Sequence, residues 1–149
     1  MGCHTWYKKL ITNNQEEIIK KVKDVISISK FYYWYEFKDL KDLLKNDEEW
    51  VQEIAEYVYD SIDGLVEVNG VWGIYESTNR YDIDAPRIGG YPDTIITSSE
   101  EMLEVMKTGL INWEGKHYDF YWDKNEEDYI KNNINEFFKE YPNGIIEFG

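Results

Sequence analysis

A tight β-hairpin is predicted by the heptapeptide VEVNGVW, residues 66–72, which is the strongest local structural signal in the chain. Its centre, Asn69-Gly70, readily adopts the two successive positive φ angles that a type I′ turn requires. The flanking residues are mainly β-branched or aromatic, as in paired strands. We therefore expect strands at 65–68 and 71–76 joined by a two-residue turn.

Helices are expected on both sides of this hairpin, because hydrophobic residues recur there at three- and four-residue spacing. Most of these segments open with acidic residues, which favour the positive end of the helix dipole. The predicted helices span residues 16–27, 49–62, 99–108 and 126–138. In the second, the expected buried stripe consists of Trp50, Ile54, Tyr57, Val58 and Ile62.

Further strands are expected where the sequence alternates or mixes aromatic and β-branched residues without helical period. They lie at residues 3–11, 80–85, 91–97, 116–122 and 145–148. This order of elements predicts an α+β fold, with about four helices over a mostly antiparallel sheet. A length of 149 residues is the usual size of one domain, so we expect a single compact domain, 1–149.

An aromatic segment at residues 31–37 follows the first helix and has no clear period. It could continue the helix or form a strand, and we favour a helix to about Phe37. Its rings could line a binding surface, but core packing is the commoner use of such residues.

The chain is strongly acidic, with 30 acidic residues against 16 basic ones and a formal net charge of -14. Such a charge repels phosphate and anionic lipid, so we expect no direct binding to nucleic acid or membrane. A basic protein would be attracted instead. The lone cysteine, Cys3, excludes an intrachain disulfide, and no apolar run has the length of a membrane span, which together predict a cytoplasmic protein.

The segment after the hairpin holds both arginines of the chain, Arg80 and Arg87, together with Asp82, Asp84 and Tyr91. A planar guanidinium holds two acceptors where lysine offers a point charge, so we expect either arginine to pair with an acid here. These five residues are the predicted binding site. The two aspartates could also hold a hard cation, although salt bridges that pin a loop are commoner.

Metal or nucleophile chemistry would depend on Cys3, His4 and His117, because the chain has no other cysteine or histidine. Asp119 shares a strand face with His117 and could orient its imidazole. We therefore take His4, His117 and Asp119 as the candidate metal ligands, with a divalent metal as the only cofactor considered. An ordinary strand histidine beside an acid is the commoner reading of this pattern.

The opening Met1-Gly2-Cys3-His4-Thr5-Trp6 resembles the start of small bacteriophage-encoded proteins, over about nine residues. The resemblance implies an accessory phage protein, a class that includes inhibitors of host defence, and it brings no catalytic residues. With the charge, it predicts an acidic anti-defence inhibitor that binds a basic nucleic-acid-handling host protein such as a nuclease, in the host cytosol. The alternative is a small metal-dependent hydrolase or ligand-binding protein that uses His117 and Asp119 or the aspartates at 82 and 84.

Overall fold

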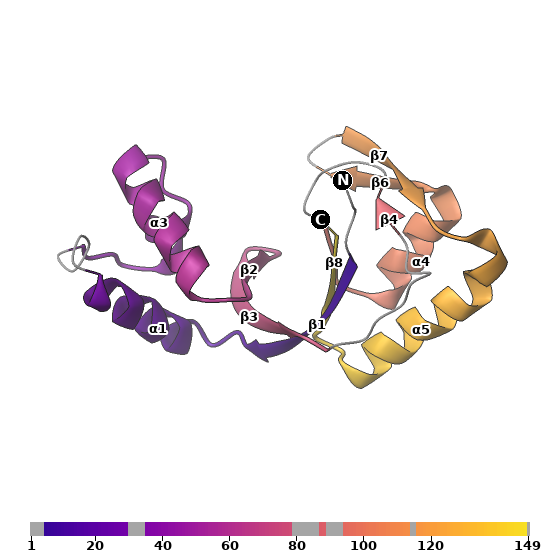
Figure 1. Cartoon of the computed structure of the whole chain (residues 1–149), viewed down its shortest axis with the longest axis horizontal. Helices are drawn as coiled ribbons and strands as arrows, with labels where there is room; N and C mark the ends of the chain where they lie inside the picture. Colours follow the sequence, from indigo (N-terminus) through magenta and orange to yellow (C-terminus); the bar gives the residue numbers. More distant parts are fainter. Residues whose placement is uncertain (1–4, 30–34, 79–86, 89–93, 114–115, 149) are drawn as a thin grey trace. The chain divides into compact units, whose positions relative to one another are not determined.

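The computed structural model describes residues 5–29, 35–78, 87–88, 94–113 and 116–148 (Figure 1). Side chains are described for the same residues except 87–88 and 111–121. The chain divides into two compact units: the middle unit, Ile11–Glu76, and the terminal unit, Met1–Leu10 together with Ser77–Gly149. Both boundaries fall inside β-strands, and the expected single domain stays a prediction.

The fold is α+β, as the sequence predicts, and its main sheet is antiparallel with the strand order β2-β3-β1-β8-β5. These strands are β1 (Thr5–Thr12), β2 (Leu65–Val68), β3 (Val71–Ser77), β5 (Thr94–Ile96) and β8 (Ile145–Phe148). A second sheet has the order β4-β7-β6 and consists of β4 (Arg87–Ile88), β6 (Leu110–Trp113) and β7 (Lys116–Tyr121). Strand β6 was not expected from the sequence.

The predicted hairpin is confirmed. Strands β2 and β3 pair in antiparallel register from Leu65↔Ile74 to Val68↔Val71. The turn residues Asn69 and Gly70 have φ angles of 52° and 82°, the two positive values that the sequence predicts.

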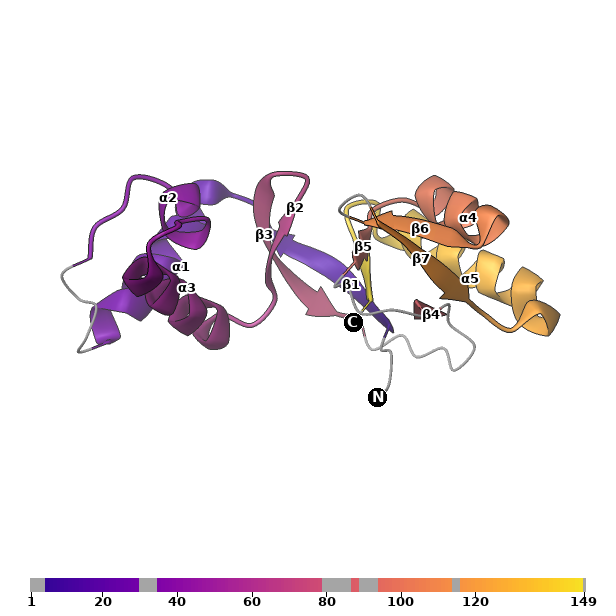
Figure 2. The same cartoon turned by 90° about the horizontal axis from the view of Figure 1, so that it is seen from above.

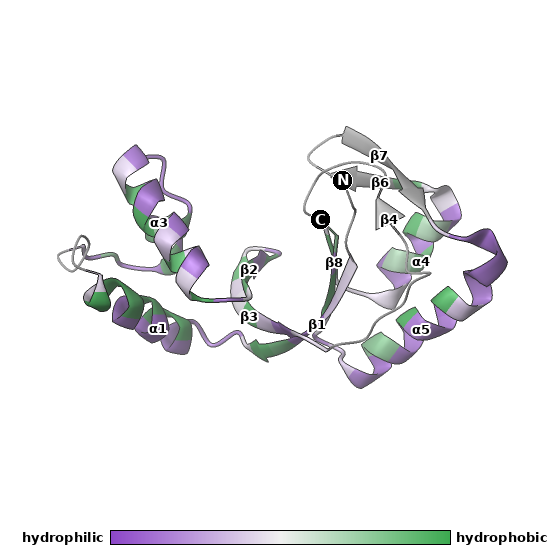
Figure 3. Ribbon diagram, in the orientation of Figure 1, coloured by the Kyte–Doolittle hydropathy of each residue, from purple (hydrophilic) through white to green (hydrophobic). Residues whose placement is uncertain are grey.

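The described part of the middle unit contains three helices: α1 (Gln15–Ile28), α2 (Leu40–Leu44) and α3 (Glu49–Ser61). Figure 2 shows α2 close to α3, and Figure 3 shows that α1 and α3 each carry hydrophobic residues on one side and hydrophilic residues on the other. The hydrophobic sides meet in one core with the hairpin. This core is formed by Ile18, Val22, Ile26, Leu40, Leu43, Leu44, Val51, Ile54, Ala55, Val58, Leu65, Trp72 and Ile74.

Two expectations for the middle unit are wrong. Helix α1 ends at Ile28, where Ser29 adopts an extended conformation, and residues 35–37 are not helical. This early end allows Tyr35 and Phe37 to pack against the same core as α1. In α3 the buried residues are Val51, Ile54, Ala55 and Val58, so the stripe includes Val51 and Ala55 in place of Trp50 and Tyr57.

The terminal unit contains α4 (Ser99–Thr108), a 3₁₀ turn η1 (Lys124–Glu126) and α5 (Glu127–Glu140). Ser98 caps α4 by accepting a hydrogen bond from the backbone N–H of Glu101, and Gly109 ends that helix with φ 71°, both as predicted. The buried face of α5, with Ile130, Ile134, Phe137 and Phe138, is also confirmed. Phe137 contacts the Tyr7 ring of β1 edge-on, with centroids 5.3 Å apart.

Among the helices of the described ranges, none has the length and apolar character needed to cross a membrane.

Candidate functional site

Of the predicted binding site after the hairpin, the structure describes only the backbone of Arg87. Arg80, Asp82, Asp84 and Tyr91 lie outside the described residues. The backbone of Arg87 belongs to β4, but its side chain is outside the described set. The predicted arginine–carboxylate pairing therefore stays a prediction.

The structure also leaves the side chains of the predicted metal ligands undescribed. His4 lies outside the described residues. His117 and Asp119 belong to β7, opposite Asn112 and Leu110 of β6, and their side chains are not among those described. Among the described side chains, no group of three or more His, Cys, Asp or Glu residues could hold a metal ion.

A stripe of exposed carboxylates runs along α3 in the middle unit. Glu49, Glu53, Glu56 and Asp60 recur at spacings of four, three and four along α3, and all four are exposed. Such spacing places them on one side of the helix. No ion pair between described residues includes any of them.

The sequence from the start of α3 to the end of the hairpin contains no cation, and the nearest preceding lysine, Lys45, pairs with Glu67 at 3.3 Å. From residue 46 to residue 76 the chain has nine acidic residues and no lysine, arginine or histidine. Two large aromatic residues are exposed on the same helix, Trp50 at 44% and Tyr59 at 38%. Helix α3 therefore combines uncompensated carboxylates with exposed aromatic surface.

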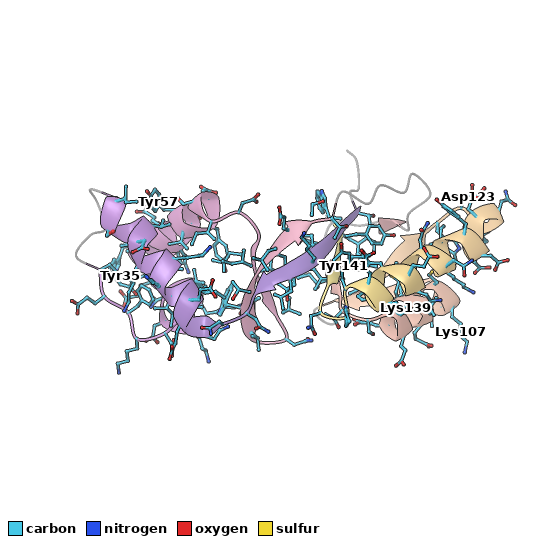
Figure 4. All side chains as sticks on the ribbon, turned by 90° about the horizontal axis from the view of Figure 1, so that it is seen from below. Tyr35, Tyr57, Lys107, Asp123, Lys139 and Tyr141 are labelled. Carbon is cyan, nitrogen blue, oxygen red and sulfur yellow. The ribbon has the colours of Figure 1, made fainter. Side chains whose placement is uncertain are left out.

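Two cavities share the lining residues Tyr35, Glu36 and Phe37. One has a volume of about 340 Å³ and is also lined by Lys23, Ile26 and Ser27. The other has a volume of about 470 Å³ and is also lined by Lys38, Asp42 and Asn46. The described lining residues all belong to the middle unit, where Figure 4 labels Tyr35. We refer to the two cavities together as the aromatic groove.

Three aromatic rings form a continuous strip along the groove. Tyr35 and Phe37 are nearly parallel, with an interplanar angle of 21° and centroids 6.0 Å apart. Trp50, at the start of α3, meets Tyr35 edge-on at 5.5 Å. At the Phe37 end, the ammonium of Lys23 lies 5.8 Å from the ring centroid, which is cation–π distance.

The Tyr35 end of the strip has the opposite electrostatic character. Burial raises the pKa of Tyr35, and the carboxylates of Asp42 and Glu48 raise it further. Negative charge near a phenol disfavours the phenolate, so the two carboxylates act in the same direction as burial. The groove thus has the Lys23 ammonium at its Phe37 end and two carboxylates acting on Tyr35, with Lys38 as a second cation in the lining.

Helix α2 fixes the acidic side of the groove. Asp39 caps this helix by accepting from the N–H of Asp42, at 2.9 Å, and Leu40 and Leu43 anchor it in the core. The carboxylate of Asp42 accepts from the backbone N–H of Lys38 at 3.3 Å, and Asn46 donates to the carbonyl of Asp42 at 2.7 Å. These bonds hold Asp42 and Asn46 at the groove wall.

Sequence reasoning did not identify the groove. The aromatic run at 31–37 was the available signal, and core packing was its favoured interpretation. In the described part of the run, Tyr35 and Phe37 pack against the core and also line the groove, while a binding role for them stays a prediction. The contribution of Asp42 to the lining could not be expected, because α2 was not predicted.

Comparisons of this chain with protein-family models, with curated proteins and with solved structures find no match.

Proposed function

We propose that this protein is a non-enzymatic binding protein that blocks a basic, nucleic-acid-handling partner by covering the surface where phosphates would bind. The observation that carries the proposal is the carboxylate stripe of α3, with exposed aromatic residues on the same helix. Aromatic residues are enriched at protein interfaces, and complementary charge speeds association with a basic partner.

The stripe also has a cost that a partner would relieve. Like charges four residues apart destabilise a helix by about 0.2–0.5 kcal/mol per pair. Glu49 with Glu53 and Glu56 with Asp60 are two such pairs. A cationic surface against α3 would convert this repulsion into attraction.

The partner class follows from the charge and from the phage-like opening of the sequence. Proteins that handle nucleic acid carry basic surfaces matched to phosphate, and an acidic domain competes for them directly. A bacterial defence nuclease in the host cytosol is the partner that we propose. Cellular location and partner identity both rest on this proposal.

The test is inhibition of purified basic bacterial defence nucleases, assayed on DNA or RNA substrate over a range of salt concentrations. We expect inhibition at low salt that weakens as salt screens the contact. A variant with Glu49→Gln, Glu53→Gln, Glu56→Gln and Asp60→Asn should inhibit at least about tenfold less, which corresponds to roughly 1.4 kcal/mol of binding free energy.

The matched control changes four exposed acids of the terminal unit, as Glu100→Gln, Glu104→Gln, Asp128→Asn and Glu136→Gln. It alters the net charge by the same amount and should inhibit like the wild type. If both variants lose inhibition equally, net charge alone explains the inhibition. That result would contradict a docking role for α3. No inhibition of any nuclease in excess protein at low salt would contradict the proposed function.

The metal-dependent alternative stays a prediction, since the side chains of His4, His117 and Asp119 are outside the described set. Metal analysis of protein purified without a histidine tag tests it. Stoichiometric zinc, manganese or calcium that is lost in His117→Ala would support it.

A further inference from the structure

We propose that the aromatic groove binds an arginine side chain of a protein partner, with the guanidinium at the Tyr35 end against the carboxylates of Asp42 and Glu36. The proposal deepens the proposed function and rests on it for the identity of the partner. The groove can be tested without that partner, because an arginine peptide carries the same chemistry.

The first argument is an internal precedent. The aromatic strip already holds one cation, the ammonium of Lys23 over the Phe37 ring. An aromatic ring attracts a cation through its negative face, and both phenylalanine and tyrosine rings do so. Among the described residues, no lysine or arginine lies at cation–π distance from Tyr35.

The second argument is an excess of carboxylates at the same end, where Asp42 and Glu36 line the cavity with one described lysine, Lys38. Among the described residues, the only hydrogen-bond donor to the Asp42 carboxylate is the backbone N–H of Lys38. Neither Asp42 nor Glu36 belongs to an ion pair between described residues. Both line the groove and both are exposed to an incoming ligand.

Shape and chemistry together favour arginine over lysine. A guanidinium is planar, stacks on aromatic rings and binds a carboxylate through two parallel N–H groups, whereas an ammonium is a strongly hydrated point charge. The groove offers a ring and a carboxylate on neighbouring walls, with Asn46 as a further polar group. A cavity of about 470 Å³ has ample room for one side chain.

The experiment is an NMR titration of the full chain with three acetylated tetrapeptide amides, made of arginine, lysine or citrulline. Citrulline keeps the planar shape but lacks the charge. We expect the arginine peptide to shift the amide signals of Tyr35, Phe37, Asp42 and Asn46, with the lysine peptide weaker and the citrulline peptide without effect. Shifts spread evenly over the acidic helices of both units would overturn the proposal.

Variants separate the ring from the charge. Tyr35→Leu removes the ring, Tyr35→Phe keeps it, and Asp42→Asn keeps the acceptor for Lys38 while removing the charge. We expect Tyr35→Leu and Asp42→Asn each to weaken arginine-peptide binding about two- to fivefold, and Tyr35→Phe to bind like the wild type. Asp42→Asn changes an exposed, isosteric side chain, so it decides the question even if Tyr35→Leu does not fold.

The control is Tyr129→Leu with Asp128→Asn, an exposed tyrosine and acid of α5. It should leave the affinity unchanged, and a loss equal to that of the groove variants would overturn the proposal. The nuclease assay then separates the two claims. Peptide binding without nuclease inhibition rejects the proposed function alone, while inhibition that Asp42→Asn and Tyr35→Leu leave intact rejects the groove as the docking point.

Discussion

The backbone carbonyl of Gly64 accepts a hydrogen bond from the N–H of Tyr75 at 2.9 Å, directly beside the start of the β2–β3 ladder. Gly64 has a φ angle of +81°, and a methyl group added to it would overlap the backbone carbonyl oxygen of Tyr75. The chain therefore turns from α3 into the hairpin through a position that excludes every side chain.

Replacing this glycine should destabilise the protein strongly. Gly64→Ala combines left-handed backbone strain with a steric overlap, so we expect a loss of roughly 2–5 kcal/mol in the free energy of unfolding. Urea unfolding followed by circular dichroism measures it.

Gly70→Ala is the matched control, because Gly70 has a similar φ of +82° and no atom within 4 Å of an added Cβ. It should lose only the backbone term of about 1–2 kcal/mol. If both variants lose the same free energy of unfolding, the backbone near Tyr75 can move to accommodate the added methyl group without a cost in stability.

The sequence predicted those elements that local chemistry specifies. Asn69-Gly70 determined the turn, Ser98 and Gly109 marked both ends of α4, and the spacing of Ile130, Ile134 and Phe137 predicted the buried face of α5. Each of these signals acts over a few residues, so no knowledge of tertiary contacts was needed.

The sequence-based predictions failed for elements whose structure depends on tertiary packing. Helix α2 has five residues, too few to show a period, and it is held by burial of Leu40, Leu43 and Leu44. The end of α1 depends on the return of Tyr35 and Phe37 to the same core, which no local pattern encodes. The aromatic groove combines both features and could not be predicted from the sequence.

The expected single domain predicts that the two units unfold together. The boundary between them falls inside β1, after Leu10, and inside β3, after Glu76, so no linker separates them. Asn14 caps α1 in the middle unit by accepting from Glu17 N–H at 3.0 Å. We expect Asn14→Ala to cost about 1 kcal/mol and to lower the protection of the slowest-exchanging amides in both units equally.

Hydrogen exchange measured by NMR reads each unit separately. Ser98→Ala provides the reciprocal variant in the terminal unit, and Ser27→Ala, at an exposed α1 position, is the control for loss of a hydroxyl. If Asn14→Ala lowers protection only in α1, α2 and α3, the units are independent domains and the single-domain prediction is wrong.

Stability should also depend on alkaline pH through Tyr59. Partial burial, and then the charge of Glu67, raise the pKa of Tyr59 to about 12. An unfolded tyrosine has a pKa near 10, so the unfolded state releases its proton first. The contribution of Tyr59 is therefore fully present below about pH 10 and is lost as the pH rises towards about 12.

Urea unfolding at several pH values between about 9 and 12 measures this fall in stability. Tyr59→Phe should make the fall less steep, and Tyr129→Phe, at an exposed position on α5, controls for loss of a phenol. An unchanged pH dependence in Tyr59→Phe would show that other groups cause the fall.

The carboxylate stripe of α3 should reduce the stability of the free protein. Glu53 lies four residues after Glu49 and three before Glu56, and Glu56 lies four before Asp60, so Glu53 and Glu56 each repel two other acids. We expect Glu53→Gln and Glu56→Gln to raise the free energy of unfolding by about 0.2–0.5 kcal/mol for each repulsive pair relieved. Urea unfolding at low salt measures the gain.

Salt separates repulsion from other causes. At about 1 M salt the screening length is about 3 Å, so the gain should vanish if repulsion causes it. Glu136→Gln in α5 is the control, because Lys139 and Glu140 lie three and four residues away and their effects on Glu136 oppose each other. If the gain in stability persists in high salt, helix propensity rather than repulsion causes it. The repulsion within α3 would then no longer support a cationic partner.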